Sequence, residues 1–115
     1  MRDYKLCLHD IKEAVEKIET FTMGFTFEEF VKDAKTVDAV IRNLEIIGEA
    51  AKHTPKRVKE RHSDIDWKAM AGMRNILTHE YFGVRMGIIW KTIGERLPEL
   101  RYRIEEILKE GKDSG

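Results

Sequence analysis

Four side chains with useful chemistry lie close together in the segment WKAMAGMRNILTHEYFGV, residues 67–84. Arg74 and His79 are accompanied there by Asn75 and Tyr81. Arginine binds phosphate through a planar fork and stays charged at any relevant pH, whereas histidine exchanges a proton near neutrality. The pair suits cleavage of RNA without a metal. In that reaction the 2′-hydroxyl attacks the adjacent phosphorus, histidine transfers a proton and arginine stabilises the phosphoryl oxygens.

Helical geometry limits how these four side chains converge. Residues advance by about 100° each along a helix, so Arg74 and His79, five positions apart in the sequence, point about 140° away from each other. Asn75 and His79, four positions apart, share one face of a helix. The side chains of Arg74 and Tyr81, seven positions apart, point in nearly the same direction. Convergence on one substrate atom therefore requires either a helix end near Thr78 or a second copy of the segment opposite the first.

The chemistry favours the second copy. Cleavage needs a general base and a general acid, and the segment contains a single histidine, His79. A homodimer joined about a two-fold axis places His79 twice in one cleft. Taken alone, however, an arginine, a histidine and a tyrosine near a helix end are more often surface capping groups than a catalytic site. Spacing by itself does not decide between these interpretations.

The segment resembles the RxxxxHxY motif of HepT-like ribonuclease toxins in the HEPN superfamily. The match includes Arg74, Asn75, His79 and Tyr81. It extends to an aromatic-Gly-Val exit at residues 82–84, a tryptophan after a short linker at 66–67, and a long second helix at 27–30, 35–36 and 39–50. RxxxxH alone is a weak pattern. The tyrosine and the extended helix make the resemblance specific, and it covers most of the chain.

The resemblance implies a homodimeric, helical endoribonuclease that is the toxin of a type VII toxin–antitoxin pair, with a minimal nucleotidyltransferase as antitoxin. The family's catalytic Arg and His correspond to Arg74 and His79, and its supporting Asn corresponds to Asn75. Its Tyr corresponds to Tyr81, which receives AMP in such pairs from ATP that the partner uses. Phosphate added beside Arg74 competes for the cation and blocks the RNA path. The toxin itself is expected to need no cofactor.

A function of a different class stays open: a non-catalytic helical partner that binds a nucleotidyltransferase and helps to position a nucleotide or substrate. In this interpretation Tyr81 still meets the partner, while Arg74 and His79 serve binding alone. Cleavage of RNA in the presence of EDTA separates the two hypotheses.

A basic cluster at residues 52–62 offers a second place for RNA to bind. Its cations are Lys52, Lys56, Arg57, Lys59 and Arg61, and Glu60 is its one acid. These side chains suit contacts with an RNA backbone, although an ordinary solvated helix explains them equally well. The remaining histidines have no recognised metal-site spacing and Cys7 is isolated from them, so we expect no bound metal.

Length and composition indicate the number of domains, the overall charge and the cellular location to expect. The 115 residues predict one domain, 1–110, followed by a frayed tail, 111–115. Because the formal net charge is zero, bulk electrostatics do not predict a polyanion partner, and any nucleic-acid site must come from local patches. The single cysteine, Cys7, excludes an intramolecular disulfide and fits a reducing compartment. There is no apolar run of about 20 residues and no signal-peptide core, so we expect a cytoplasmic protein without membrane contact.

Apolar periodicity predicts an all-α, HEPN-like, up-and-down bundle of four to five helices. The expected helical regions are 3–20, 27–52 with a break near 35–36, a short one to residue 62, one from residue 67, and 85–110. Thr54 is predicted as an N-cap before Pro55, and Pro98 is predicted to kink or split the last region. Trp67 and Trp90 are interpreted as core anchors, with stacking on bases as the alternative. Three methionines, at 70, 73 and 86, are interpreted as core filler.

Overall fold

The computed structural model describes residues 3–73 and 82–114, with side chains for 3–73 and 86–110. Every regular element in these two ranges is a helix, which confirms the all-α prediction. The helices are α1 (Tyr4–Thr22), α2 (Phe27–Lys32), α3 (Ala34–His53), α4 (Lys56–Arg61), α5 (Trp67–Ala71), α7 (Phe82–Glu95) and α8 (Leu97–Ser114). These seven helices of the described ranges comprise four long and three short ones, whereas the prediction was four to five helices.

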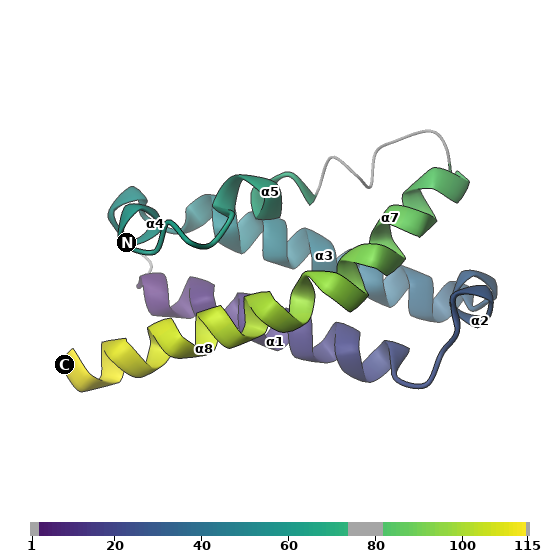
Figure 1. Cartoon of the computed structure of the whole chain (residues 1–115), viewed down its shortest axis with the longest axis horizontal. Coiled ribbons are helices and arrows are strands. Elements are labelled where there is room, and N and C mark those ends of the chain that lie inside the picture. Colours follow the sequence, from purple (N-terminus) through teal and green to yellow (C-terminus); the bar gives the residue numbers. More distant parts are fainter. Residues whose placement is uncertain (1–2, 74–81, 115) are drawn as a thin grey trace.

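The long helices run up and down along one axis of an elongated molecule, 46 × 27 × 24 Å (Figure 1). Helix α3 returns antiparallel to α1, and α7 followed by α8 returns beside α1 (Figure 1). Helix α1 packs against both α3 and α8, while α5 packs on α3. The antiparallel order follows from the short connections between the helices, as predicted.

The first helix is amphipathic, and its predicted apolar stripe is fully buried. Leu8, Ile11, Val15 and Ile18 each have 0% of their surface exposed. The opposite face carries charged pairs such as Lys17 with Glu13. Burial of this stripe against α3 and α8 makes α1 the central element of the bundle.

The break in the second helical region falls at Asp33, two residues before the predicted position. Thr26 and Glu29 form a capping box at the start of α2, with backbone-to-side-chain hydrogen bonds of 2.9 and 3.1 Å. Asp33 ends α2 and also starts α3, because its carboxylate accepts a hydrogen bond from the Thr36 amide at 3.1 Å. The break therefore falls at Asp33, because its side chain can cap the start of α3.

The prediction that Thr54 caps the following helix is wrong. Thr54 instead terminates α3, where its hydroxyl donates to the Ala50 carbonyl oxygen at 2.8 Å and is buried. Pro55 is the N-cap residue of α4 and supplies no side-chain hydrogen bond. A threonine hydroxyl can bond backward to the carbonyl four residues earlier, and burial selects that bond here.

The last region begins earlier than expected and is split. Helix α7 starts at Phe82 rather than at the expected residue 85. Helix α7 ends at Glu95 and α8 begins at Leu97, which places Pro98 in the first turn of α8, where its missing N–H costs nothing. Helix α8 continues to Ser114, beyond the expected boundary at 110.

One hydrophobic core joins the helices. Its largest fully buried side chains come from α1, α2, α3, α7 and α8, and include Phe30, Ile47 and Met86. Trp90 of α7 packs on Phe30 with ring centroids 5.0 Å apart. Among the helices that the structure describes, none is long and apolar enough to cross a membrane.

Candidate active site

The motif segment joins the end of α5 to the start of α7. Arg74, Asn75, His79 and Tyr81 all lie outside the described residues, so their predicted roles stay predictions. The described residues on both sides show how the two ends of the segment are held. Met73 precedes the segment and is 7% exposed, and Phe82 begins α7 directly after it.

Helix α5 is short but firmly placed. Asp66 caps it, since the carboxylate accepts a hydrogen bond from the Ala69 amide at 2.9 Å. The buried indole of Trp67 donates from Nε1 to the His62 carbonyl oxygen at 3.0 Å. Met70, 2% exposed, adds a core contact from the same helix. The core-anchor interpretation of Trp67 is therefore confirmed, and the segment enters from a fixed support.

Helix α7, which follows the motif segment, is also packed into the core. Met86 and Ile89 are each 1% exposed. The Trp90 ring lies against Phe30 and Phe27 of α2, at centroid distances of 5.0 and 6.1 Å. Aromatic pairs at these distances contribute beyond their buried area. Through Trp90, α7 is thus held by α2 as well as by the rest of the core.

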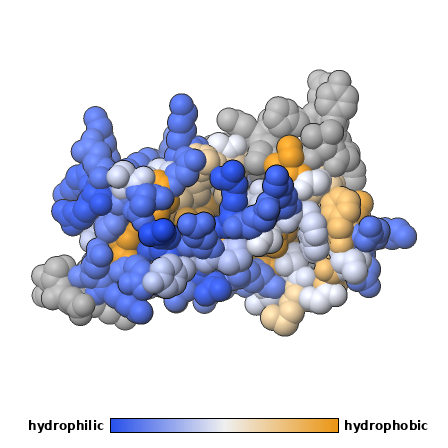
Figure 2. All heavy atoms as spheres, viewed as in Figure 1, coloured by the Kyte–Doolittle hydropathy of each residue, from blue (hydrophilic) through white to orange (hydrophobic). Residues whose placement is uncertain are grey.

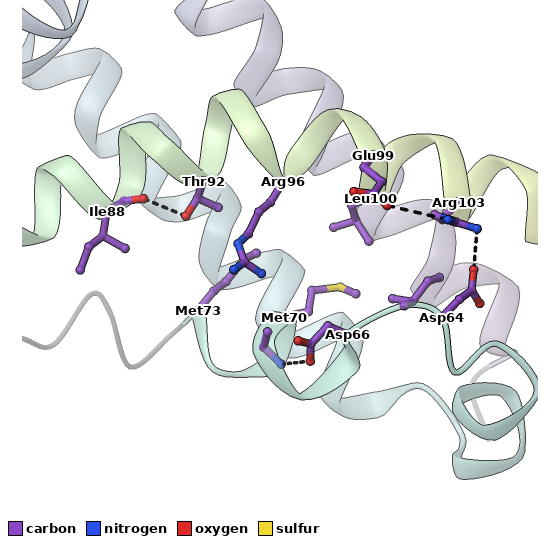
Figure 3. Close-up of a pocket in the computed structure, with 12 residues that line it drawn as sticks. Asp64, Asp66, Met70, Met73, Ile88, Thr92, Arg96, Glu99, Leu100 and Arg103 are labelled. Carbon is purple, nitrogen blue, oxygen red and sulfur yellow. Dashed lines mark hydrogen bonds and ion pairs between the residues drawn. The ribbon is translucent and has the colours of Figure 1, made fainter.

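A pocket of about 400 Å³ lies between α5 and the junction of α7 with α8 (Figure 3). It is lined by Asp64, Ile65, Asp66, Ala69, Met70, Met73, Ile88, Thr92, Arg96, Glu99, Leu100 and Arg103. No motif in the sequence indicates this pocket. Its walls come from residues up to 39 positions apart that only packing brings together, so no local spacing signals it.

Among the described residues, one arginine of the pocket, Arg103, forms ion pairs and the other, Arg96, does not. Arg103 Nη1 lies 2.7 Å from Asp64 Oδ2, and Arg103 Nη2 lies 3.8 Å from Glu99 Oε1 (Figure 3). The Arg96 side chain extends from the α7–α8 junction toward α5 (Figure 3). Within the described part of the chain, the Arg96 guanidinium has no ion pair or hydrogen bond.

The basic cluster is found on another part of the molecule. Lys52 lies in the last turn of α3, and the other four cations, Lys56, Arg57, Lys59 and Arg61, lie on α4. Apart from Lys59, which is half-buried, these side chains are exposed, and Lys56 forms a surface pair with Glu60 at 3.8 Å. Figure 1 shows α4 at the opposite end of the molecule from the start of α7. That end also presents a mainly hydrophilic face (Figure 2).

Two further polar side chains, Arg101 and Asn43, form hydrogen bonds within the bundle. The Arg101 guanidinium joins α8 to α1 through Glu19 at 2.8 Å, and this hydrogen bond is the main reason that the pKa of Arg101 is raised. Asn43 on α3 is buried and donates to the Ala39 carbonyl oxygen at 2.8 Å. No group of three or more His, Cys, Asp or Glu side chains within 3–73 and 86–110 is placed to hold a metal.

Comparison with known proteins places most of the chain in one family. The family model described as ribonuclease HepT-like matches residues 11–107. A protein of Thermococcus cleftensis named probable ribonuclease HepT is 49% identical over 108 residues, which cover 94% of this chain and 98% of that protein. No solved structure matched the chain.

Two further relatives carry names that give them as candidate RNases. One, from Caldanaerobacter subterraneus, is 47% identical over 91% of this chain and 90% of its own length. The other, from Methanocaldococcus jannaschii, is 44% identical over 97% of this chain and 94% of its own length. The family description and the relatives' names agree with the enzyme class that the sequence predicted. The chain belongs to the ribonuclease HepT-like family.

Proposed function

We propose that this protein is a metal-independent endoribonuclease that cleaves RNA by attack of a 2′-hydroxyl on the adjacent phosphorus. The observation that carries the proposal is the family match over residues 11–107, which contains the entire Arg74 to Tyr81 motif. The flanking residues support it, because Met73 before the motif segment and Met86 after it are both buried in the core. Precise placement of reacting groups requires such anchoring.

The roles of the motif residues follow from their chemistry. His79 acts as general acid and base, because its proton exchanges near neutral pH. Arg74 stabilises the negative charge that develops on the phosphoryl oxygens. Asn75 orients or binds the phosphate. The exposed cations of the basic cluster at residues 52–62 bind a part of the RNA backbone farther from the cleaved linkage.

The catalytic unit in this proposal is a homodimer. A single motif supplies one histidine, whereas the reaction requires both a base and an acid. A two-fold axis brings a second His79 and a second Arg74 into one cleft. The proposed active site therefore belongs to the pair of chains rather than to either chain alone.

The biological role that we propose is that of the toxin in a type VII toxin–antitoxin pair in the cytoplasm. A minimal nucleotidyltransferase acts as antitoxin and transfers AMP from ATP to Tyr81. Each added AMP brings a phosphate beside Arg74, which then no longer holds the RNA phosphate. Inhibition thus acts on the same cation that catalysis uses.

A cleavage assay with labelled RNA in EDTA tests this function. The purified chain is expected to produce fragments ending in 2′,3′-cyclic phosphate, and the His79→Ala variant is expected to produce none. Both proteins are compared by circular dichroism to confirm that they are folded alike. If neither protein cleaves any RNA while the chain still binds a nucleotidyltransferase, the non-catalytic partner hypothesis replaces this one. Cleavage that depends on Mg²⁺ contradicts the metal-independent mechanism.

A further inference from the structure

The pocket between α5 and the α7–α8 junction has an apolar floor that suits a flat ring. Met70 and Met73 belong to this floor and are almost fully buried, and Ile88 lines the pocket with 40% of its surface exposed. Methionine is flexible and polarisable, and its sulfur makes favourable contacts with aromatic rings. A volume of about 400 Å³ falls within the range of pockets that hold small molecules.

The charges of the pocket point to an anion at one end. Arg103 is already neutralised by Asp64 and Glu99, at 2.7 and 3.8 Å. Arg96 has no such partner among the described residues, and its side chain projects across the pocket toward α5 (Figure 3). A guanidinium fork matches the geometry of phosphate better than that of other common anions except carboxylate.

The acids of the pocket do not oppose this assignment. Asp64 and Glu99 both face Arg103, and the Asp66 carboxylate accepts the hydrogen bond that caps α5 at 2.9 Å. Their remaining lone pairs suit the amino groups on the edge of a base. A ligand that combines a flat ring, amino groups and a phosphate is a nucleotide unit of RNA.

The position of the pocket along the chain links it to the proposed reaction. Met73 lines the pocket and is bonded directly to Arg74. We propose that the pocket holds one base of the RNA substrate beside the cleaved linkage, while Arg96 binds the phosphate attached to that nucleotide. This inference rests on the proposed ribonuclease function and adds to it a substrate-binding subsite, in which Arg96 acts in binding and not in bond cleavage.

Binding measurements test the role of Arg96 separately from cleavage. The parent chain is His79→Ala, which leaves the RNA intact, and affinity for a fluorescent single-stranded RNA is measured by anisotropy. Adding Arg96→Ala is expected to weaken binding about tenfold, since hydrogen bonds to charged groups contribute about 1.5–3 kcal/mol. It should also lower the slope of log affinity against log salt by about 0.7, the value for one lost phosphate contact on a single strand.

The matched control is Lys91→Ala, which removes one exposed positive charge from α7 outside the pocket. It should change neither the affinity nor the salt slope by a comparable amount. Equal effects of Arg96→Ala and Lys91→Ala overturn the proposal. In the catalytically intact chain, Arg96→Ala is expected to raise KM and leave kcat nearly unchanged.

A second pair of variants tests the base. Ala69 is exposed and lines the pocket, so Ala69→Leu fills it, whereas Ala34→Leu adds the same atoms to an exposed position of α3 outside it. With the wild-type chain, an abasic ribose at one nucleotide beside the cleaved linkage should raise KM about tenfold. In Ala69→Leu, the KM should be the same for the abasic and the intact RNA. In Ala34→Leu, the KM should still be about tenfold higher for the abasic RNA. Identical profiles for both variants overturn the proposal.

The outcomes separate the subsite from the ribonuclease function. Cleavage by the wild-type chain with no dependence on Arg96 rejects the subsite alone. RNA binding that depends on Arg96, without cleavage, rejects the ribonuclease function and leaves the pocket as a site for RNA binding alone. No RNA binding at all rejects both. The mass of each variant in solution is also measured, because a changed oligomeric state with unchanged RNA affinity identifies the pocket as a protein interface and overturns the subsite.

Discussion

Arg103 of α8 forms an ion pair with Asp64, which lies 39 positions earlier in the turn before α5, with Nη1 and Oδ2 2.7 Å apart. The pair closes one end of the pocket (Figure 3). It also links the turn before α5 to α8, the last helix of the bundle. Its two side chains are 43% and 50% exposed, so water screens much of the attraction.

A double-mutant cycle on this pair should give a small coupling energy. We expect Asp64→Asn and Arg103→Gln to show a coupling of about 0.5–1 kcal/mol in urea unfolding, decreasing in 1 M salt. The Lys17–Glu13 pair on α1 is the control, with about 0.3–0.5 kcal/mol expected for an exposed pair four residues apart. A coupling above 2 kcal/mol, or one that salt leaves unchanged, contradicts a screened surface pair.

Replacement of Trp90 by alanine should destabilise the protein by about 3 kcal/mol, the lower end for a large aromatic, since Trp90 is only partly buried. The loss arises because its ring packs on Phe30 and Phe27 and holds α7 to α2. Urea unfolding measures it. Tyr102→Ala is the control, since that side chain is 60% exposed and its removal should change stability by less than about 0.5 kcal/mol.

Mixing wild-type and His79→Ala chains tests whether one active site uses two histidines. After subunit exchange, equal amounts of both chains leave a quarter of the dimers with two His79 residues. If both are needed, the cleavage rate of a fixed amount of wild type falls to about half. If one suffices, mixed dimers are active and the rate rises instead. The same mixture assayed before exchange is the control, and an unchanged rate after exchange argues against a shared site.

Tyr81→Phe should produce a ribonuclease that the antitoxin cannot silence. With a minimal nucleotidyltransferase and ATP, the wild-type chain is expected to gain the mass of AMP and to lose cleavage activity, while Tyr81→Phe gains no mass and stays active. Intact mass spectrometry and the cleavage assay measure the two effects. Tyr102→Phe alters an exposed tyrosine of α8 and should behave as wild type. Modification of Tyr81→Phe at another residue rejects the assigned site.

The basic cluster should contribute affinity that depends on salt but not on RNA sequence. Arg57→Ala with Arg61→Ala is expected to lower the salt slope of RNA binding by about 1.4, for two lost phosphate contacts. The control removes two exposed lysines at the other end of the molecule, Lys32 and Lys35. Equal slopes for both double variants identify the cluster as an ordinary solvated helix.

The sequence by itself determined the helical class, the long helices and the family. These features are local: apolar residues at steps of three and four set the buried face of α1, and the Thr26–Glu29 box starts α2. The motif residues were likewise recognisable from type and spacing, although their positions fall outside the described residues. Chemistry that depends on the order of residues in one segment can be read without a fold.

Only the tertiary structure decided the features that depend on burial or on distant residues. Thr54 bonds backward to Ala50 because burial favours that partner over the next helix. The pocket exists because packing brings Asp64, Met73 and Arg96 to one place, and their spacing in the sequence carries no signal of it. Periodicity reports which face of a helix is buried, but not which other helix covers it or which cavity remains between them.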